Sequence, residues 1–490
     1  MRKFAFAILL LGLSFVVNAQ IKRPKLVVGL VVDQMRWDFL YYYYDQYGEG
    51  GIKRLLNGGF SCENTMINYV PTVTAIGHSS IFTGSTPALT GICGNNYVIN
   101  GKPVYCVEDK TVNSVGSTNE AGQMSPRNLL STTIGDELKV ATNFRSKVIG
   151  IALKDRAAIL PAGHGADAAY WYDIKAGHFI SSSYYMDKLP GWVEQFNRKN
   201  QTKPGFDVKN DPVGVSLTFK LAEAALENEQ LGTDDITDLL TVSVSSTDAM
   251  GHTYGTRGKE MDAVYMQLDR DLTAFLRILD EKVGRDNYLL FLTADHGSAH
   301  NPNFLKDHRL PAGGFNTGAM VKQLNERIKE QFGIDQAVMN INANRVYLNR
   351  LAIKEKYEVV KQAAVALLKE NKEIQFVVDF EKATYTTIPQ LIRERIVNGY
   401  NPDRSGDIFI VPKPQHIAGG DNPAYKGTTH CVWNPYDAHI PLLFYGWNVL
   451  HGSTSAPTYI VDIAPTVCAM LHIQMPNACI GNAITEVKTR

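Results

Sequence analysis

The chain has 490 residues, of which 44% are hydrophobic and 20% charged, a composition that is typical of globular proteins and excludes a disordered chain. Its length suits one large α/β domain with insertions, or two domains. The 49 Lys and Arg residues balance the 49 Asp and Glu residues, so nothing indicates an electrostatic nucleic-acid binder.

Residues 1–19 are predicted to be a cleaved secretory signal. Arg2 and Lys3 precede an almost wholly apolar run over residues 4–17, and small residues lead to a cut before Gln20. The run is too short to span a bilayer, so no stable membrane insertion is expected. The sequence therefore predicts a periplasmic or secreted protein. Six cysteines permit disulfides in such a compartment, and their pairing stays open.

Continuous apolar runs recur along the chain, which is typical of strands buried on both faces of a parallel sheet. Helical segments lie between them, for example over residues 128–141 and 258–281. Strands that alternate with helices predict an α/β fold with a mostly parallel central sheet and helices on both faces. The expected strands are 25–32, 147–153, 239–246, 288–293 and 440–445.

Two regions of the main domain, which is expected over residues 20–490, look inserted. The region near 166–235 begins with a stretch rich in Tyr and Ser. The region near 302–400 carries two amphipathic helices around a short strand at 344–348, which predicts a smaller α+β cap.

Three of the apolar runs lead into carboxylates, namely Asp33, Asp248 and Asp295. In open α/β sheets, ligands bind outside the carboxyl ends of the strands. The three acids are therefore expected to converge on one edge of the sheet. A single Asp after a strand is unremarkable, but three with companion histidines form a more specific pattern.

The companion histidines point to a metal centre. Asp248 and His252 are four residues apart and share a face if they lie on a helix. Asp295 is followed directly by His296, and His430 ends a Gly-Thr-Thr-His motif. Oxygen and imidazole ligands without thiolate suit Zn²⁺, with Mn²⁺ as the second choice. The pattern provides enough ligands for two zinc ions per chain.

Thr74 follows a proline turn and precedes small residues, which predicts a hydroxyl at a helix N-terminus. An isolated Thr in this context is usually an ordinary helix cap. Free backbone N–H groups there favour an anion, however, and a neighbouring metal can activate the hydroxyl as a nucleophile. The metal ligands elsewhere in the chain favour this second interpretation.

Lys154 and Arg156 follow another apolar run and can bind phosphate oxygens, as a point charge and a planar fork respectively. If the segment is extended, both side chains point to one face and Asp155 points away. The alternative is two solvated loop charges, which their place beside the metal site argues against.

These motifs resemble those of the alkaline phosphatase superfamily, and most closely the secreted phosphate-irrepressible alkaline phosphatases, over residues 24–486. The matching segments are Val-Val-Asp33-Gln-Met-Arg, Pro-Thr-Val-Thr74-Ala-Ile-Gly-His, Gly-Ile-Cys-Gly-Asn95-Asn, Leu-Lys154-Asp-Arg156, Ser-Thr-Asp248-Ala-Met-Gly-His252, Ala-Asp295-His296-Gly and Gly-Thr-Thr-His430. The departure is Cys431, where many relatives are expected to have Gly.

The resemblance implies a phosphate monoester hydrolase that forms a covalent phospho-threonine on Thr74. It implies that Asn95, Lys154 and Arg156 bind the non-bridging phosphoryl oxygens. Two zinc ions are implied as cofactors. The implied ligands are Asp248, His252 and His430 for the zinc that later activates water, and Asp33, Asp295 and His296 for the zinc that holds Thr74.

The nearest alternative is a type I phosphodiesterase/nucleotide pyrophosphatase, which uses the same zinc ligands. Lys154 and Arg156 favour a dianionic monoester over a diester. A sulfatase lacks support because no Cys-x-Pro-x-Arg or Ser-x-Pro-x-Arg motif is present. A non-enzymatic binding protein would not need a nucleophile beside a metal. The expected partners are small phosphate esters and no nucleic acid; the oligomeric state stays open.

Overall fold

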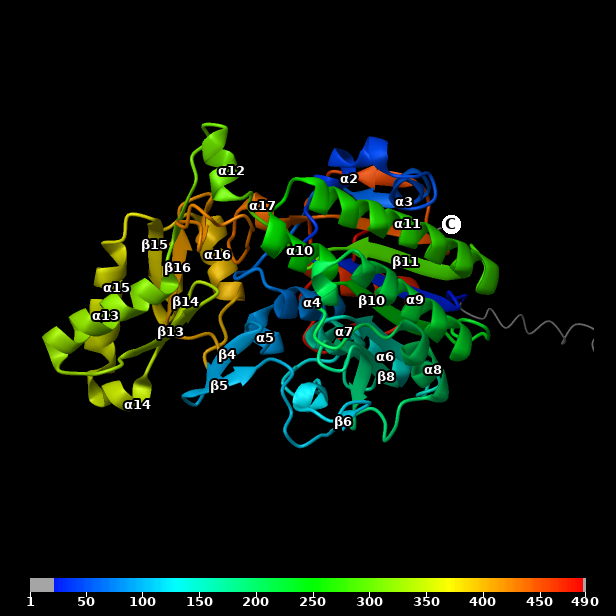
Figure 1. Cartoon of the computed structure of the whole chain (residues 1–490), viewed down its shortest axis with the longest axis horizontal. Coiled ribbons are helices and arrows are strands. Elements are labelled where there is room, and N and C mark those ends of the chain that lie inside the picture. The colour runs from blue at the N-terminus through cyan, green and yellow to red at the C-terminus, as the bar shows by residue number, and fades with distance from the viewer. Residues whose placement is uncertain (1–21, 488–490) are drawn as a thin grey trace, which may run out of the picture.

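A ten-stranded mixed sheet organises the fold (Figure 1), which we describe from a computed structural model over residues 22–487. The strand order is β20-β2-β19-β11-β1-β10-β7-β8-β9-β6. The predicted signal at 1–19 lies outside the described residues. The strands are β1 (Leu26–Val32), β2 (Phe60–Cys62), β6 (Ser114–Val115), β7 (Val148–Ala152), β8 (Ala168–Asp173), β9 (His178–Ser182), β10 (Asp238–Val244), β11 (Tyr288–Thr293), β19 (Leu442–Gly446) and β20 (Gly452–Thr454).

The middle of the sheet is parallel, which confirms the predicted α/β fold. β1 pairs in parallel with β10 and β11, and β7 pairs in parallel with β10 and β8. Every residue of β1, β7, β10 and β11 is buried, because helices cover both faces, and this is why their sequences are continuous apolar runs. The strand expected at 440–445 forms as β19 but pairs antiparallel with β11.

Helices cover both faces because the parallel crossovers run in two directions. α7 links β7 to β8 on one side, whereas α11 links β10 to β11 on the other, and right-handed connections then place these helices on opposite faces. The helix expected at 128–141 begins only at Ile134, because Thr133 and Asp136 form a capping box. The main helices are α4 (Thr74–Thr83), α6 (Ile134–Ala141), α7 (Asp155–Ala162), α9 (Val213–Asn228), α10 (Ser246–Tyr254), α11 (Lys259–Lys282) and α18 (Ile463–Leu471).

A second, four-stranded antiparallel sheet lies beside the main one, at the left of Figure 1. It has a hydrophobic cluster of its own, and the order of its strands is β13-β14-β16-β15. The strand predicted at 344–348 is one of its members. Its elements are β13 (Val338–Asn342), β14 (Arg345–Leu348), β15 (Ile374–Asp379), β16 (Ile408–Pro412), α13 (Thr317–Phe332) and α15 (Tyr357–Lys369).

The region predicted as an insertion near 166–235 contributes β8 and β9 to the main sheet, so its first part belongs to the core. The rest includes α8 (Gly191–Asn200) and the 3₁₀ turn η3 (Val208–Asn210). Among residues 22–487, every helix is too short or too polar to traverse a bilayer. The six cysteines are free thiols.

Candidate active site

The carboxyl ends of β1, β10 and β11 bring the three predicted acids together. Asp33 directly follows β1, Asp248 lies in the first turn of α10, and Asp295 follows β11. Two groups of three residues could each hold a metal ion. Within each group the ligand atoms all lie within 4.8 Å of one another, and all of these side chains are buried. The groups are Asp33, Asp295 and His296, and Asp248, His296 and His430.

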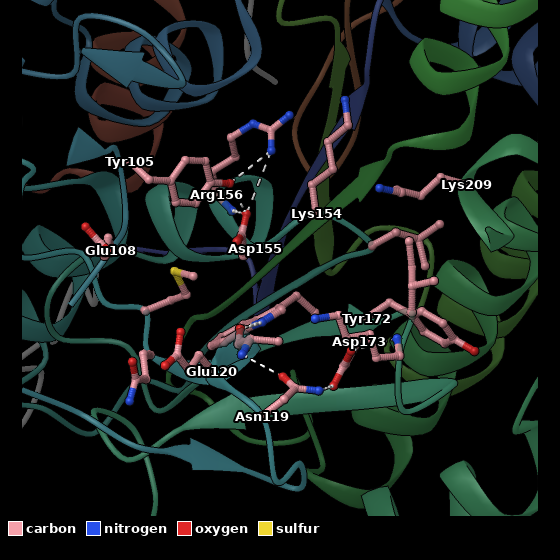
Figure 2. Close-up of a pocket in the computed structure, with 17 residues that line it drawn as sticks. Tyr105, Glu108, Asn119, Glu120, Lys154, Asp155, Arg156, Tyr172, Asp173 and Lys209 are labelled. Carbon is pink, nitrogen blue, oxygen red and sulfur yellow. Dashed lines mark hydrogen bonds and ion pairs between the residues drawn. The ribbon is translucent and has the colours of Figure 1, made fainter. Parts of the chain in front are cut away.

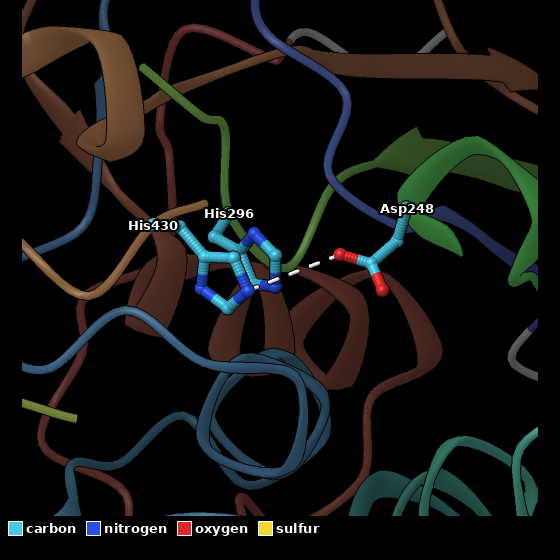
Figure 3. A group of neighbouring side chains, drawn as sticks. All are labelled: Asp248, His296 and His430. Carbon is cyan, nitrogen blue, oxygen red and sulfur yellow. Dashed lines mark ion pairs between the residues drawn. The ribbon is translucent and has the colours of Figure 1, made fainter. Parts of the chain in front are cut away.

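His296 belongs to both groups, which the sequence pattern did not predict. Its ring stacks on that of His430 with centroids 3.7 Å apart and planes at 16°, and His430 Nε2 lies 3.9 Å from Asp248 Oδ1 (Figure 3). His252 lies on α10 as expected, with its Nε2 3.2 Å from Asp248 Oδ1. It is nevertheless outside both mutually close groups, so its role as a ligand stays a prediction.

The ligand atoms of this cluster, carboxylate oxygens and imidazole nitrogens, are suited to bind a metal cation. Asp33 Oδ1 and His296 Nε2 are buried and have no hydrogen-bond partner among residues 22–487, and the near neighbour of Asp295 Oδ2 outside the cluster is His78 Nδ1 at 3.2 Å. A buried polar atom left unpaired is costly, and carboxylate and imidazole atoms facing one another are a typical ligand set for Zn²⁺. The cluster can therefore hold metal.

The orientation of the histidines supports the same conclusion. Nδ1 of His252 lies 2.8 Å from the Thr428 carbonyl oxygen, and Nδ1 of His296 lies 3.0 Å from that of Gly297. Nδ1 of His430 lies 2.5 Å from the Thr72 carbonyl oxygen. A carbonyl oxygen can only accept, so each Nδ1 carries a proton, and Nε2 of a neutral ring is left with a lone pair. This is the usual arrangement of metal-ligating histidine. Burial favours the neutral ring at His296 and His430, whereas the neighbouring Asp248 raises the pKa of His252.

Charge is concentrated in this cluster. Lys154 Nζ lies 2.6 Å from Asp33 Oδ2 and 2.5 Å from Asp248 Oδ2. Burial, together with the charges of Asp248 and Asp295, raises the pKa of Asp33 well above its usual range. Burial also lowers the pKa of His296 and His430, which keeps both imidazoles neutral. Three acids thus face one ammonium.

Thr74 is the first residue of α4, as predicted, and contacts around it tie this helix to the metal cluster. A Cβ on Gly77 would come within 2.6 Å of the Asp295 Cβ, so the first turn of α4 packs directly on that acid. His78 places its Nδ1 3.2 Å from Asp295 Oδ2. Thr74 is 1% exposed and lies at the end of the helix where the first backbone N–H groups have no acceptor in the preceding helical turn.

The β-hairpin of β4 (Asn96–Ile99) and β5 (Lys102–Tyr105) supports the predicted phosphate ligands. Asn95, just before β4, accepts a hydrogen bond through its Oδ1 from the Ala75 backbone N–H at 3.0 Å, beside Thr74. Tyr105, at the end of β5, accepts from Arg156 at 3.0 Å and donates to Asp155 Oδ1 at 2.5 Å. The structure thus brings Asn95 to the start of α4.

The expected extended geometry of Lys154–Arg156 is wrong. Lys154 is extended, but α7 begins at Asp155, so Arg156 already lies on a helix. The two cationic side chains nevertheless extend in the same direction, while Asp155 turns to Tyr105 (Figure 2). Asp155 is an acidic residue in the first turn of α7, where the helix dipole favours negative charge, and its carboxylate accepts from the Arg156 backbone N–H at 2.6 Å.

Sequence reasoning missed Gln34 as part of the site. Its side-chain amide donates to Asp248 Oδ1 at 2.7 Å, and its backbone N–H donates to Asp295 Oδ1 at 3.1 Å. Gln34 therefore links two acids that follow different strands, β10 and β11. It adopts φ 64°, an unusual conformation for a residue with a side chain, which is often found at functional sites. Its only sequence signal is its place after Asp33.

Cys431, the residue that departs from the expected motif, has a backbone conformation that favours glycine. It adopts φ 101°, in the left-handed region that favours glycine. Its backbone N–H donates to Thr72 Oγ1 at 3.1 Å, and Thr72 also accepts from His430 through its carbonyl oxygen. The loop thus keeps the glycine-like conformation and holds His430 against the segment before Thr74.

Comparison with known proteins places the chain. A family model described as type I phosphodiesterase / nucleotide pyrophosphatase matches residues 27–433. The chain belongs to this family. The solved structure of wild-type alkaline phosphatase PafA superposes on this chain with a TM-score of 0.92 at 44% identity, over 96% of this chain and 99% of that chain.

Two relatives match the present chain over almost its full length. A protein from Myroides odoratus named calcium-transporting ATPase is 46% identical over 99% of this chain and 97% of its own. Alkaline phosphatase PafA from Elizabethkingia meningoseptica is 45% identical over 95% of each chain. These likenesses confirm the expected resemblance to the alkaline phosphatase superfamily.

Proposed function

We propose that this protein is an alkaline phosphatase that hydrolyses phosphate monoesters through Thr74 and two zinc ions. The observation that carries the proposal is the buried cluster of unpaired ligand atoms against which the first turn of α4 packs. The likeness to alkaline phosphatase PafA supports it.

The proposed metal ligands divide into two sets around this cluster. When bound, zinc supplies positive charge that favours the ionised hydroxyl and the departing oxygen. His296 lies between the sets, because its ring stacks on that of His430. We assign Asp33, Asp295 and His296 to one ion, and Asp248, His252 and His430 to the other.

Thr74 acts as the nucleophile. Its hydroxyl releases a proton to solvent, and its Oγ1 forms a bond to phosphorus as the bond from phosphorus to the alcohol oxygen breaks. The departing alkoxide takes up a proton from water and leaves as the alcohol. Water then attacks the phospho-threonine and releases phosphate and the free hydroxyl. Throughout, the positive end of the dipole of α4 favours the negative charge on the phosphoryl group.

Asn95, Lys154 and Arg156 bind the non-bridging phosphoryl oxygens in this proposal. Asn95 is fixed by the Ala75 N–H, and Arg156 by Tyr105. Arg156 Nε is buried without a partner among residues 22–487, which leaves a donor for a ligand. Two cations on one side of the phosphoryl group match the two charges of a monoester better than the single charge of a diester.

Replacing both cations tests the preference for monoesters. The double substitution Lys154→Ala and Arg156→Ala is expected to lower kcat/KM for an aryl phosphate monoester by roughly two to four powers of ten, because each charge-assisted contact contributes about 1.5–3 kcal/mol. Hydrolysis of a matched aryl diester should fall much less.

Lys188 and Arg198, which are exposed, provide a matched double-alanine control. Equal losses on the two esters would show that Lys154 and Arg156 support the fold or bind phosphate without discrimination. A wild-type protein that prefers the diester would replace this proposal with the phosphodiesterase.

We also propose that the protein is exported, with residues 1–19 as a cleaved signal. The support is the sequence pattern alone. Mass spectrometry of the secreted protein should find a mature start at or near Gln20. An active periplasmic enzyme that retains Met1 would contradict export by cleavage.

A further inference from the structure

A cavity of about 510 Å³ adjoins the start of α7, next to the proposed phosphate ligands (Figure 2). Lys154, Asp155, Arg156 and Trp171 are among the residues that line it. Trp171 is 2% exposed, and its indole N–H donates to the Ala121 carbonyl oxygen at 2.9 Å, so the ring is fixed. The lining of the cavity thus includes a fixed aromatic side chain.

Lys209 projects into this cavity from the turn η3 (Figure 2). The turn packs against α10, the helix that carries Asp248 and His252. Asn210 Oδ1 accepts from the Thr253 hydroxyl at 2.8 Å, which fixes the turn one residue away from His252. Lys209 is therefore held between the proposed phosphate ligands and the helix that carries Asp248 and His252.

The ammonium of Lys209 is half-buried, and no hydrogen bond or salt bridge within residues 22–487 engages it. Burial lowers its pKa, Asp207 and Asp155 act against this, and Lys154 and Arg156 add to it. Neither acid is a direct partner: Asp155 accepts from Tyr105, and Asp207 from Asn210 at 2.6 Å. A half-buried cation next to the cations Lys154 and Arg156 is stabilised when an anion binds to it.

The two ends of the cavity differ in charge. Lys209 lies at the end near Lys154, whereas Glu108 and Glu120 lie toward the opposite side in Figure 2. Lys209 therefore favours an anion at its own end of the cavity. The ring of Trp171, which also lines the cavity, suits the carbon part of a ligand.

We propose that this cavity takes the alcohol part of the phosphate monoester and that Lys209 binds an anionic substituent on it, either a carboxylate or a second phosphate. The inference rests on the proposed function and adds a preferred class of substrate to it. Lys209 becomes a specificity residue that contacts the substrate but not the transferred phosphoryl group.

The test compares substrates that differ only in the charge of the alcohol part. Carboxyphenyl phosphate is paired with carbamoylphenyl phosphate, which has the same shape without the charge, and phosphonomethylphenyl phosphate represents a second phosphate. The 3- and 4-isomers are both used. The measurement is the ratio of kcat/KM for the anionic and the neutral ester in wild type, Lys209→Ala, Lys209→Gln and the exposed control Lys203→Ala.

Wild type should prefer an anionic ester, and Lys209→Ala and Lys209→Gln should lower the ratio by about tenfold through loss of one charge-assisted contact. Lys203→Ala should leave the ratio unchanged. The carboxyl and phosphonomethyl arms show which anion is preferred. An unchanged ratio in both Lys209 variants, or an equal loss on charged and neutral esters, would overturn the inference. Absence of turnover on every ester in wild type would instead contradict the proposed function.

Discussion

Thr74→Ala is expected to lower phosphate monoester turnover by about four powers of ten or more, because loss of a catalytic nucleophile removes the whole covalent route. Thr74→Ser should retain a large part of the activity, since it keeps a hydroxyl at the start of α4. Both variants should fold, because the Thr74 side chain does not cap the helix.

Thr317 provides a matched control for this substitution. It is also the first residue of a helix, α13. That helix packs on the four-stranded sheet and not on the metal cluster. Thr317→Ala should change neither turnover nor the melting temperature by much. Rapid quench of wild type with labelled substrate should trap phosphate on Thr74. Near-wild-type turnover by Thr74→Ala would refute its role as nucleophile.

Removal of metal is expected to abolish turnover, and added zinc should restore it. The reason lies in the cluster itself, where three buried carboxylates face the single ammonium of Lys154. Such an excess of buried negative charge is unfavourable unless cations compensate it. Chelation should therefore also lower the melting temperature, because a ligand bound only to the folded state stabilises that state.

Metal analysis should find two zinc ions per active chain. Full activity after thorough chelation, or less than one zinc per active chain, would rule out the two-zinc proposal. The zinc content of the His252→Ala variant is informative, since His252 lies outside the two groups of mutually close ligand atoms. A variant that keeps two ions would remove His252 from the ligands and leave His296 shared between them.

Much of the fold and of the candidate site was determined by local sequence. Strands buried on both faces must be apolar throughout, so β1 and β11 are visible as continuous runs, and the polar residues that end them mark one edge of the sheet. The start of α4 at Thr74 and the shared helical face of Asp248 and His252 also follow from nearby residues.

Only the tertiary structure decided how distant segments meet. The stacking of His296 on His430, the reach of Lys154 to Asp33, and the link from Gln34 to Asp248 each join residues more than one hundred positions apart. Helical and strand periodicity carry no information at that separation, because they report only which face of one element is buried. The antiparallel pairing of β19 and the position of Lys209 beside α7 were likewise settled by packing between elements.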